Sequence, residues 1–386
     1  NRLLRSHTID AAIREHYGPE VKQQLKAWVQ DIADGDKPAA NAGEAFLGRL
    51  RQGVSAAGLG FNAMSAVIQP LGLTQSVVRV GARWIGRGVA KYLGGPIELT
   101  RKVNQMSSFM ENRARTRFRE LNELRNRVQD ESAFSEFAGR YAYFLMTRCQ
   151  QMVDVPTWWG AYEKAIAAGE DDNRAVALAD QAVIDAQGGG QTKDLSGIER
   201  GGQALRLFTV FYSFMNTALN VGVSQTMTAD TPQKRAKLAV DYLLLYVAPV
   251  VLGFALKNAI TPGDSGDDDW GKVARKLVAE EIGFLMGLLV VVREFSDAGK
   301  IVAGVPSFGY QGPAGVRLIP DSLKLAQQAQ QGEFDDAFRK AFVNVAGGLF
   351  GLPAAQANRT ITGAQALAEG KTGNPAAIVF GFQEAR

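Results

Sequence analysis

The sequence predicts an all-α protein, an elongated assembly of many helices joined by connectors rich in Gly and Pro, with little or no β-sheet. Three observations lead to this prediction. Apolar residues recur at helical spacing, strict alternation of apolar and polar residues is rare, and several windows lack Asp, Glu, Lys, Arg and His altogether. Those windows are 52–78, 207–229, 242–256 and 341–358. Long uncharged helices have to be covered by other helices, by other subunits or by lipid.

Composition narrows the classes of protein that fit. Hydrophobic residues make up 46% of the 386 residues, enough for a large core, and 21% charged residues exclude a disordered polyelectrolyte. The net charge of +4 is mild, so nucleic-acid binding would depend on local clusters of basic residues. The single cysteine, Cys149, excludes an internal disulfide. A mean hydropathy of −0.09 argues against a conventional polytopic membrane protein.

In the first half of the chain, Gly and Pro punctuate a series of expected helices. These helices cover 10–33 with an interruption at Gly18-Pro19, 54–68, 75–93, 98–129, 132–153 and 171–187. Pro70 should kink or end the second helix, and Gly94-Gly95-Pro96 should stop the third. Pro156 should end the helix over 132–153. The last helix begins with acidic residues, which the helix dipole favours in a first turn.

The second half begins with a polar connector over 187–202, which contains three consecutive glycines at 188–190. We expect four regions: an N-terminal helical segment (1–50), a helical block with basic helices (51–187), a Gly-rich linker (188–202) and a second helical block (203–386). Gly347, Gly348 and Gly351 should let helices approach closely, and the helix that holds the first two should end before Pro353. The stretch 301–316 is expected to be an extended loop. Because the chain starts with Asn, we expect a processed product or part of a longer polypeptide.

Two apolar runs, 242–256 and 282–292, predict a helical hairpin with charged residues at its ends. A helix that spans a bilayer needs about 20 apolar residues, and only 238–256 approaches this length, if Asp241 is tolerated. One interpretation is therefore a buried core helix, and the other is membrane contact in a different state of the protein. The residues expected to pack against a membrane or another subunit are Leu244, Val247, Val251, Phe254, Leu285 and Leu289.

Basic residues at a spacing of four would form one cationic ridge on a helix over 75–93, and a second basic stretch follows over 101–127. The residues expected to contact DNA or another anionic surface are Arg79, Arg83, Arg87, Lys91, Arg113, Arg117 and Arg125. Such a ridge could follow a phosphate backbone without reading its sequence, or contact anionic lipid headgroups. It could equally be a solvated face or a protein contact, since nearby glutamates compensate part of the charge.

Few residues of this sequence are of the types that catalytic sites use most often. The only histidines are His7 and His16, so a His-based triad or a Cys/His zinc site is not expected. The glycines at 188–190 lack the spacing and the Gly-Lys-Ser/Thr ending of a nucleotide-binding loop. The acidic run 264–269 does not match a calcium loop and is expected to be a solvated turn. We therefore expect no catalytic residues, no metal and no cofactor.

Four segments, taken in order, carry a resemblance to a known family. They are 68–75 (IQPLGLTQ) leading into a basic helix, 154–159 (DVPTWW) with 179–183 (ADQAV), 187–195 (QGGGQTKDL) running to 208–216 (FTVFYSFMN), and 351–356 (GLPAAQ) with 358–361 (NRTI). Their order and spacing are similar to the C-terminal "large polyvalent protein-associated" type region of giant internal virion proteins of short-tailed bacteriophages. The resemblance extends from about residue 50 to the end of the chain.

The resemblance implies an internal virion, or DNA-ejection, protein without catalytic residues in this region. Such proteins are stored in the capsid near the portal, are expelled ahead of the genome and help to build a conduit across the host envelope. The implied partners are other copies of the chain, other internal virion proteins, the portal, genomic DNA bound without sequence preference, and the host membrane. The alternatives are an accessory helical domain of a larger virion enzyme, a peptidoglycan hydrolase or a polymerase, and a pore-forming module.

Overall fold

The structure is a computed structural model that describes residues 6–34, 41–59, 61–116, 144–189, 192–209, 212–263 and 314–383, with a few single positions between 274 and 285. Within these ranges the regular structure is helical, and an isolated bridge between Gly263 and Gln383 is the only β-type pairing. The predicted all-α class is confirmed.

The helices of the first half are short and mostly separated by one to four residues. They are α1 (His7–Tyr17), α2 (Pro19–Asp34), α3 (Ala42–Leu59), α4 (Ala63–Val67), the 3-10 turn η2 (Gln69–Gly72), α5 (Leu73–Val80), α6 (Ala82–Gly94), α7 (Pro96–Met106), α8 (Ser108–Thr116), α11 (Phe144–Ala167) and α12 (Asp172–Gln187). The longest of them, α11, lies against α6 and α12.

The second half starts with the short turn η3 (Thr192–Asp194) and continues as longer helices. They are α13 (Gln203–Phe208), α14 (Tyr212–Met227), α15 (Pro232–Tyr242), the π-helical turn η4 (Leu243–Val247), α16 (Ala248–Ile260), α19 (Ala314–Gln331), α20 (Asp336–Phe350), α21 (Ala354–Ala368) and α22 (Ala377–Phe380). The elements α15, η4 and α16 follow one another without a break and form one continuous helix, Pro232–Ile260.

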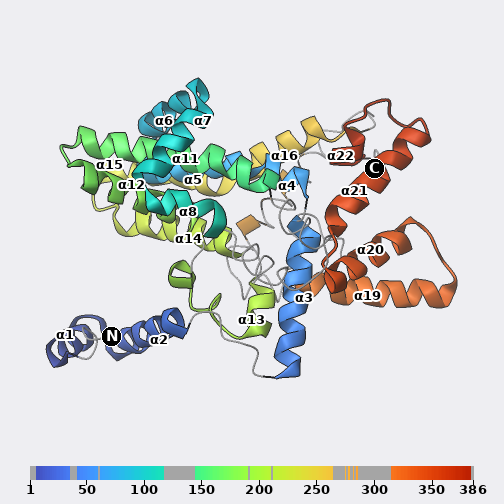
Figure 1. The fold of residues 1–386 in the computed structure, drawn as a ribbon, viewed down its shortest axis with the longest axis horizontal. Helices are drawn as coiled ribbons and strands as arrows, with labels where there is room; N and C mark the ends of the chain where they lie inside the picture. The colour runs from blue at the N-terminus through green and yellow to red at the C-terminus, as the bar shows by residue number, and fades with distance from the viewer. Residues whose placement is uncertain are drawn as a thin grey trace.

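Figure 1 shows α3 standing between two groups of helices. On one side lie α5, α6, α11, α12, α14 and α15, and on the other side lie α19, α20 and α21. The N-terminal helices α1 and α2 form an arm that reaches η3, where the Trp28 indole donates to the Lys193 carbonyl oxygen at 2.9 Å. An ion pair between Arg200 and Asp31 (2.8 Å) holds the same junction.

The main hydrophobic core lies where α5, α6, α7, α8 and α12 pack around α11. Trp158 is fully buried at its centre, and its ring stacks on Tyr162 with 5.3 Å between centroids. A second, small cluster of Val78, Val221 and Leu245 joins α5 to α14 and η4. The two blocks predicted on either side of the linker 188–202 therefore touch each other. The predicted boundary at residue 50 falls inside α3.

Several predicted helix ends are confirmed by local geometry. Gly18 separates α1 from α2 with a φ of 87°, a conformation that glycine adopts without strain. The Asp171 side chain caps α12 by accepting from the Arg174 amide at 2.9 Å. Gly351 ends α20 in the left-handed conformation, before Pro353 as predicted.

Two predictions about single helices are wrong. The basic segment 75–93 is not one helix, because Gly81 (φ 109°) separates α5 from α6 and redirects the chain. Pro156 does not end a helix, since α11 continues through it to Ala167. An interior proline costs about 3 kcal/mol, but burial of Val153 and Val155 beside it offsets this cost at about 1.5–3 kcal/mol each.

Glycine pairs allow unusually close helix crossings. A Cβ atom on Gly88 of α6 would lie 2.1 Å from the Pro156 carbonyl oxygen of α11, and one on Gly160 would lie 2.5 Å from the Trp84 carbonyl oxygen. At the crossing of α3 and α20, a Cβ atom on Gly53 would lie 2.0 Å from the Gly348 carbonyl oxygen. The predicted role of the glycines in 341–358 is confirmed.

Three further expectations fall partly outside the described residues. Of the predicted loop 301–316, residues 314–316 belong to α19 and are helical, and residues 301–313 lie outside the described residues. The predicted helix over 98–129 is broken at Ser107, and its part beyond residue 116 is not described. The acidic run 264–269 lies outside the described residues as well.

Candidate functional site

Three of the four segments that carry the family resemblance meet in one buried polar network. At its centre the Arg113 guanidinium of α8 makes two hydrogen bonds to the Asp154 carboxylate of α11, at 2.7 and 3.2 Å. Its third nitrogen donates to the Gly188 carbonyl oxygen at 2.8 Å, and the Gln150 amide donates to Asp154 at 2.9 Å. Both charged side chains are almost completely buried. The ion pair therefore holds α8, α11 and the end of α12 together.

The network continues from α12 to α5. The Gln187 side-chain amide donates to the Gly72 carbonyl oxygen at 2.7 Å and to the Ser76 hydroxyl at 3.0 Å. The hydroxyls of Ser76 and Thr157 share a hydrogen bond of 2.6 Å, and Thr157 also donates to the Val153 carbonyl oxygen at 2.7 Å. The glycine at 72 is required because an added Cβ would lie 2.8 Å from the Gln187 oxygen. Ser76, Thr157 and Gln187 thus satisfy one another inside the fold, whereas the side-chain amide of Gln75, the last residue of segment 68–75, is buried without a hydrogen-bond partner among the described residues.

A second carboxylate, that of the half-buried Asp180 on α12, accepts hydrogen bonds from neutral neighbours. The Ser107 hydroxyl and the Trp158 indole donate to the same carboxylate oxygen at 2.6 and 2.7 Å. Burial raises the pKa of the Asp180 carboxyl above its usual value, and the two hydrogen bonds offset the shift only in part. Ser107 also accepts from the Met110 amide at 3.0 Å, so this site fixes the start of α8.

The fourth resembling segment attaches α21 to the break between α3 and α4. The Gln356 side chain accepts from the Ala63 amide at 3.3 Å and donates to the Val379 carbonyl oxygen at 2.8 Å. The Arg359 guanidinium donates to the Asn62 side chain at 2.6 Å, while that same side-chain oxygen caps α4. These contacts tie the C-terminal helices to the middle of the chain.

The predicted cationic ridge is divided by the break at Gly81. Arg79, on α5, is bound to Asp185 of α12, and Arg87, on α6, forms a 2.8 Å ion pair with Glu163 of α11. Arg83 and Lys91 are exposed on α6, and within the described residues no acidic side chain pairs with either. Arg83 and Arg87 both lie over the Trp84 ring, 5.2 and 5.3 Å from its centre.

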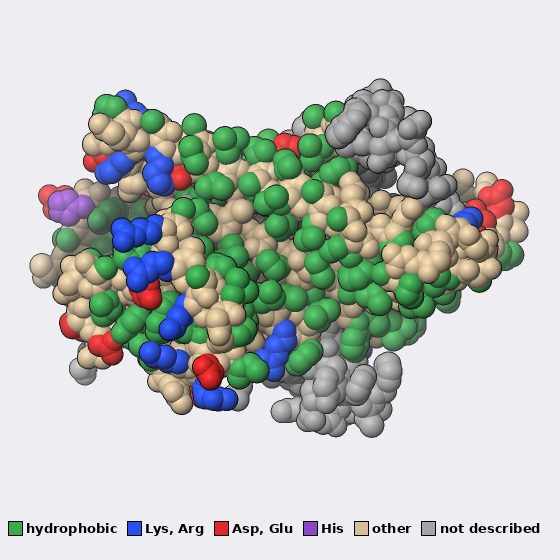
Figure 2. All heavy atoms as spheres, turned by 90° about the horizontal axis from the view of Figure 1, so that it is seen from above, with side chains coloured by type: hydrophobic (Ala, Val, Ile, Leu, Met, Phe, Trp, Pro, Cys, Tyr) green, Lys and Arg blue, Asp and Glu red, His purple; other side chains and the backbone are tan. Residues whose placement is uncertain are grey.

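Figure 2 shows Lys and Arg side chains gathered over the part of the upper face that holds the α5–α12 group. Of the predicted anionic-surface residues, Arg113 is 2% exposed and bound to Asp154. The prediction that it meets an external anion is wrong, because its charge is used inside the core. Arg117 and Arg125 lie outside the described residues.

The helix Pro232–Ile260 is the apolar feature that stands out on the surface. It has 29 residues, and its most apolar 18-residue window has a mean hydropathy of 2.0. Only 22% of that window is buried, so the expectation of a buried core helix is wrong for this fold. Within the described residues it is the one helix with the length and composition to cross a membrane.

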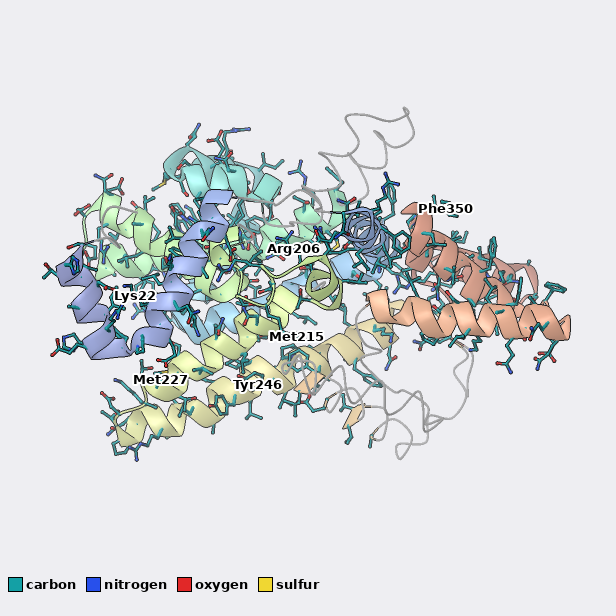
Figure 3. The ribbon with its side chains drawn as sticks, turned by 90° about the horizontal axis from the view of Figure 1, so that it is seen from below. Lys22, Arg206, Met215, Met227, Tyr246 and Phe350 are labelled. Carbon is teal, nitrogen blue, oxygen red and sulfur yellow. The ribbon has the colours of Figure 1, made fainter. Side chains whose placement is uncertain are left out.

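The predicted hairpin partner of this helix, 282–292, lies mainly outside the described residues, as does Leu289. Among the described residues, α14 lies beside this helix. Figure 3 shows the two helices side by side, with Met227 near the outer end and Tyr246 farther along. Of the predicted packing residues, Val251 and Leu285 are exposed, and Leu244, Val247 and Phe254 are partly buried.

The nucleophiles and metal-binding side chains of the described residues are scattered. Within the described ranges, no group of three or more His, Cys, Asp and Glu side chains could hold a metal ion. Burial raises the pKa of the Cys149 thiol, which disfavours the reactive thiolate. His7 and His16 lie at the two ends of α1, in the N-terminal arm.

Comparison with known proteins yields no match at any of three levels. No family model matches the sequence, no curated protein matches it, and no solved structure matches the fold.

Proposed function

We propose that this chain is a structural component of the internal core and DNA-ejection apparatus of a short-tailed bacteriophage. In this proposal it forms a homo-oligomer inside the capsid, beside the portal and other internal virion proteins. It is then expelled and helps to form a conduit for the genome across the host envelope. Its role is mechanical, and no catalytic residue is assigned to it.

The observation that carries the proposal is the position of the four resembling segments in the fold. Segments 68–75, 154–159 and 187–195 build the polar network around Asp154, and segment 351–361 attaches the C-terminal helices. Buried networks of this kind tie a unique arrangement of helices together, because each unpaired group would be costly. The resemblance to internal virion proteins therefore concerns the scaffold of the chain and not a few surface positions.

Two surface features fit the same role. The exposed helix Pro232–Ile260 offers a large apolar area to other subunits or to lipid. Arg83 and Lys91 offer positive charge for non-specific contact with phosphate groups. A conduit protein needs surfaces of both kinds, since it meets packed DNA before ejection and an envelope afterwards.

The position of the chain in the particle tests the proposal. Antibodies against this chain should detect it in purified particles, and external protease should leave it intact until ejection is triggered. Tomography of particles that carry a tagged chain should place the tag beside the portal, on the inside of the capsid. Absence of the chain from particles, or cleavage by protease in intact particles, would contradict an internal location.

The enzymatic alternative predicts a different result. Purified full-length chain should leave peptidoglycan and nucleotide substrates unchanged if its role is mechanical. Release of soluble fragments from peptidoglycan, or polymerisation of nucleotides, would support an accessory domain of a virion enzyme instead. A preparation with a verified helical circular dichroism spectrum makes a negative result meaningful.

A further inference from the structure

Charge is distributed along the α14–α16 hairpin in a pattern that fits a bilayer. The first arm, α14, carries no Asp, Glu, Lys or Arg. The second arm, Pro232–Ile260, has Lys234, Arg235 and Lys237 near its start and Lys257 near its end. Lys234 pairs with Asp230, and Lys237 pairs with Asp241, which is the one Asp, Glu, Lys or Arg between Lys237 and Lys257. The second arm is therefore apolar between basic ends, and α14 is uncharged along its whole length.

The distance between the charged ends corresponds to the thickness of the hydrocarbon layer. Lys237 and Lys257 are 20 residues apart in one continuous helix, which gives about 30 Å at about 1.5 Å per residue. Tyr242 follows Lys237 by five residues, toward the basic end of this stretch, and tyrosine rings favour the headgroup level because their polar ends can remain in contact with water. Asp241 is held by Lys237 through both carboxylate oxygens at 2.6 Å, so its charge is neutralised within the helix.

The hairpin packs on the rest of the protein along one side. Val78 of α5 contacts Val221 of α14 and Leu245 of η4, and α14 also lies against α12. Leu243 and Leu252 remain 56% and 49% exposed. Within the hairpin, Tyr246 fits over Gly222, where an added Cβ would lie 2.0 Å from the tyrosine hydroxyl oxygen. The two arms are thus joined closely to each other, and the second arm keeps exposed apolar side chains on its outer side.

We infer that the α14–α16 hairpin is the element of this chain that binds an anionic lipid bilayer, with Lys234, Arg235 and Lys237 at the headgroups and the exposed apolar side chains in the hydrocarbon. The inference rests on the proposed function for its biological setting, the host envelope. Length and charge identify the occupant. The apolar stretch matches the thickness of the hydrocarbon layer. At its start, the three basic residues Lys234, Arg235 and Lys237 outnumber their two carboxylate partners, Asp230 and Asp241, which leaves positive charge for anionic headgroups.

Vesicle flotation tests the inference on the full-length chain. Wild-type protein should float with vesicles of phosphatidylcholine containing about 30% phosphatidylglycerol. Val251→Glu/Leu252→Glu should weaken binding more than tenfold, because two carboxylates enter the apolar face. Lys234→Gln/Arg235→Gln should weaken binding roughly fivefold for each charge removed and should lower its salt dependence. These side chains are exposed, so the variants should keep the wild-type circular dichroism spectrum.

Helix α19, which packs on α3 and α20, supplies matched controls outside the hairpin. Leu323 is 66% exposed and Lys324 is exposed, so Leu323→Glu and Lys324→Gln make the same chemical changes outside the hairpin. Both controls should float as wild type does. If the hairpin variants also float as wild type does, lipid binds elsewhere and the inference fails. If they instead abolish self-association in the absence of vesicles, a second copy covers this face and the inference also fails.

A fluorescent label on one introduced cysteine measures insertion of the hairpin into the bilayer directly. In Cys149→Ser protein, an NBD label is attached at Leu243→Cys. Its fluorescence emission should shift to shorter wavelength on vesicle binding, and aqueous iodide should quench it less. The same label at Leu323→Cys should change neither property. Equal shielding at both positions would contradict a specific role for the hairpin. This outcome is independent of whether the chain is found inside phage particles, so the inference and the proposed function can fail separately.

Discussion

Replacement of Gly88 by Ala tests the closest helix crossing in the core. Gly88 lies on α6 where it crosses α11, and an added Cβ would stand 2.1 Å from the Pro156 carbonyl oxygen and 3.2 Å from the Gly160 nitrogen. Both obstacles are backbone atoms, so no side chain can rotate away. Ordinary contact begins at about 3.4 Å, and α6 therefore has to move about 1.3 Å away from α11.

The expected loss of stability follows from a comparison with Gly86, which lies two residues earlier on the same helix. An added Cβ at Gly86 has no heavy atom within 4 Å, so Gly86→Ala should stabilise the protein by up to about 1 kcal/mol through helix propensity. Gly88→Ala gains the same helix propensity, but overpacking at the crossing should destabilise the protein by about 3 kcal/mol. This value is at the upper end of the usual range because the backbone has to move. The two variants should therefore differ by about 3 kcal/mol, since the propensity term cancels.

Urea denaturation followed by circular dichroism and by tryptophan fluorescence measures this difference. Trp84, Trp158 and Trp159 lie at or near the crossing, so fluorescence should also report a looser native state in Gly88→Ala. Gly160→Ala should behave similarly, and the double variant should lose less than the sum, because the helices separate only once. Equal stabilities for Gly86→Ala and Gly88→Ala would refute the crossing geometry, and with it the position of α6 on α11.

Three further predictions concern the charged side chains. Asp154→Asn should lower the free energy of unfolding by about 3–5 kcal/mol in urea denaturation, because it leaves Arg113 buried without its carboxylate. Asp180→Asn should be neutral or stabilising at pH 7. Because burial raises the pKa of Asp180 in the folded state, the stability of the wild-type protein falls as the pH rises through that folded pKa. The stability advantage of the variant in thermal melts should therefore grow from about pH 4 to pH 7. A difference that stays constant with pH would contradict this assignment. Arg83→Gln/Lys91→Gln should lower the slope of the logarithm of DNA affinity against the logarithm of salt concentration by about 2, and an unchanged slope would exclude α6 as a phosphate contact.

Local signals in the sequence were sufficient for most helix ends. Gly18-Pro19, Gly95-Pro96 and the Asp171 cap act within a few residues, through φ restriction or a side chain that accepts from the first amides. The same reasoning gave the end of α20 before Pro353. Such signals need no knowledge of the rest of the fold, which is why they could be predicted.

Breaks that depend on tertiary contact could not be predicted in this way. Gly81 is a single glycine inside a helical pattern, and nothing near it in the sequence demands a φ of 109°. Its conformation lets α6 turn onto α11, a helix that begins more than sixty residues later. Pro156 shows the reverse case, in which a strong local stop signal is overridden by burial of the helix on two sides.

The candidate functional surfaces likewise had features that the sequence could predict and features that it could not. The apolar helix was visible in the sequence, but its exposure was not, because hydropathy does not distinguish a core helix from an unpartnered one. Arg113 was assigned to a basic surface because its neighbours in the sequence are basic. Its partner Asp154 lies 41 residues away in the sequence and is the only acid in the apolar stretch 144–162. An isolated acid within an otherwise apolar helix is a signal of a buried ion pair, and it could have identified this contact.

The buried network also restricts which substitutions the fold tolerates at the polar positions of these segments. Gln187, Gly72 and Thr157 can be exchanged only if all their partners change together, since a half-satisfied buried network is worse than an apolar core. Exposed residues such as Leu252 or Arg83 are under no such restriction from the fold. Substitutions at such exposed positions therefore leave the buried scaffold unchanged. On this reasoning the four segments report the scaffold, and function has to be sought on the hairpin and on α6.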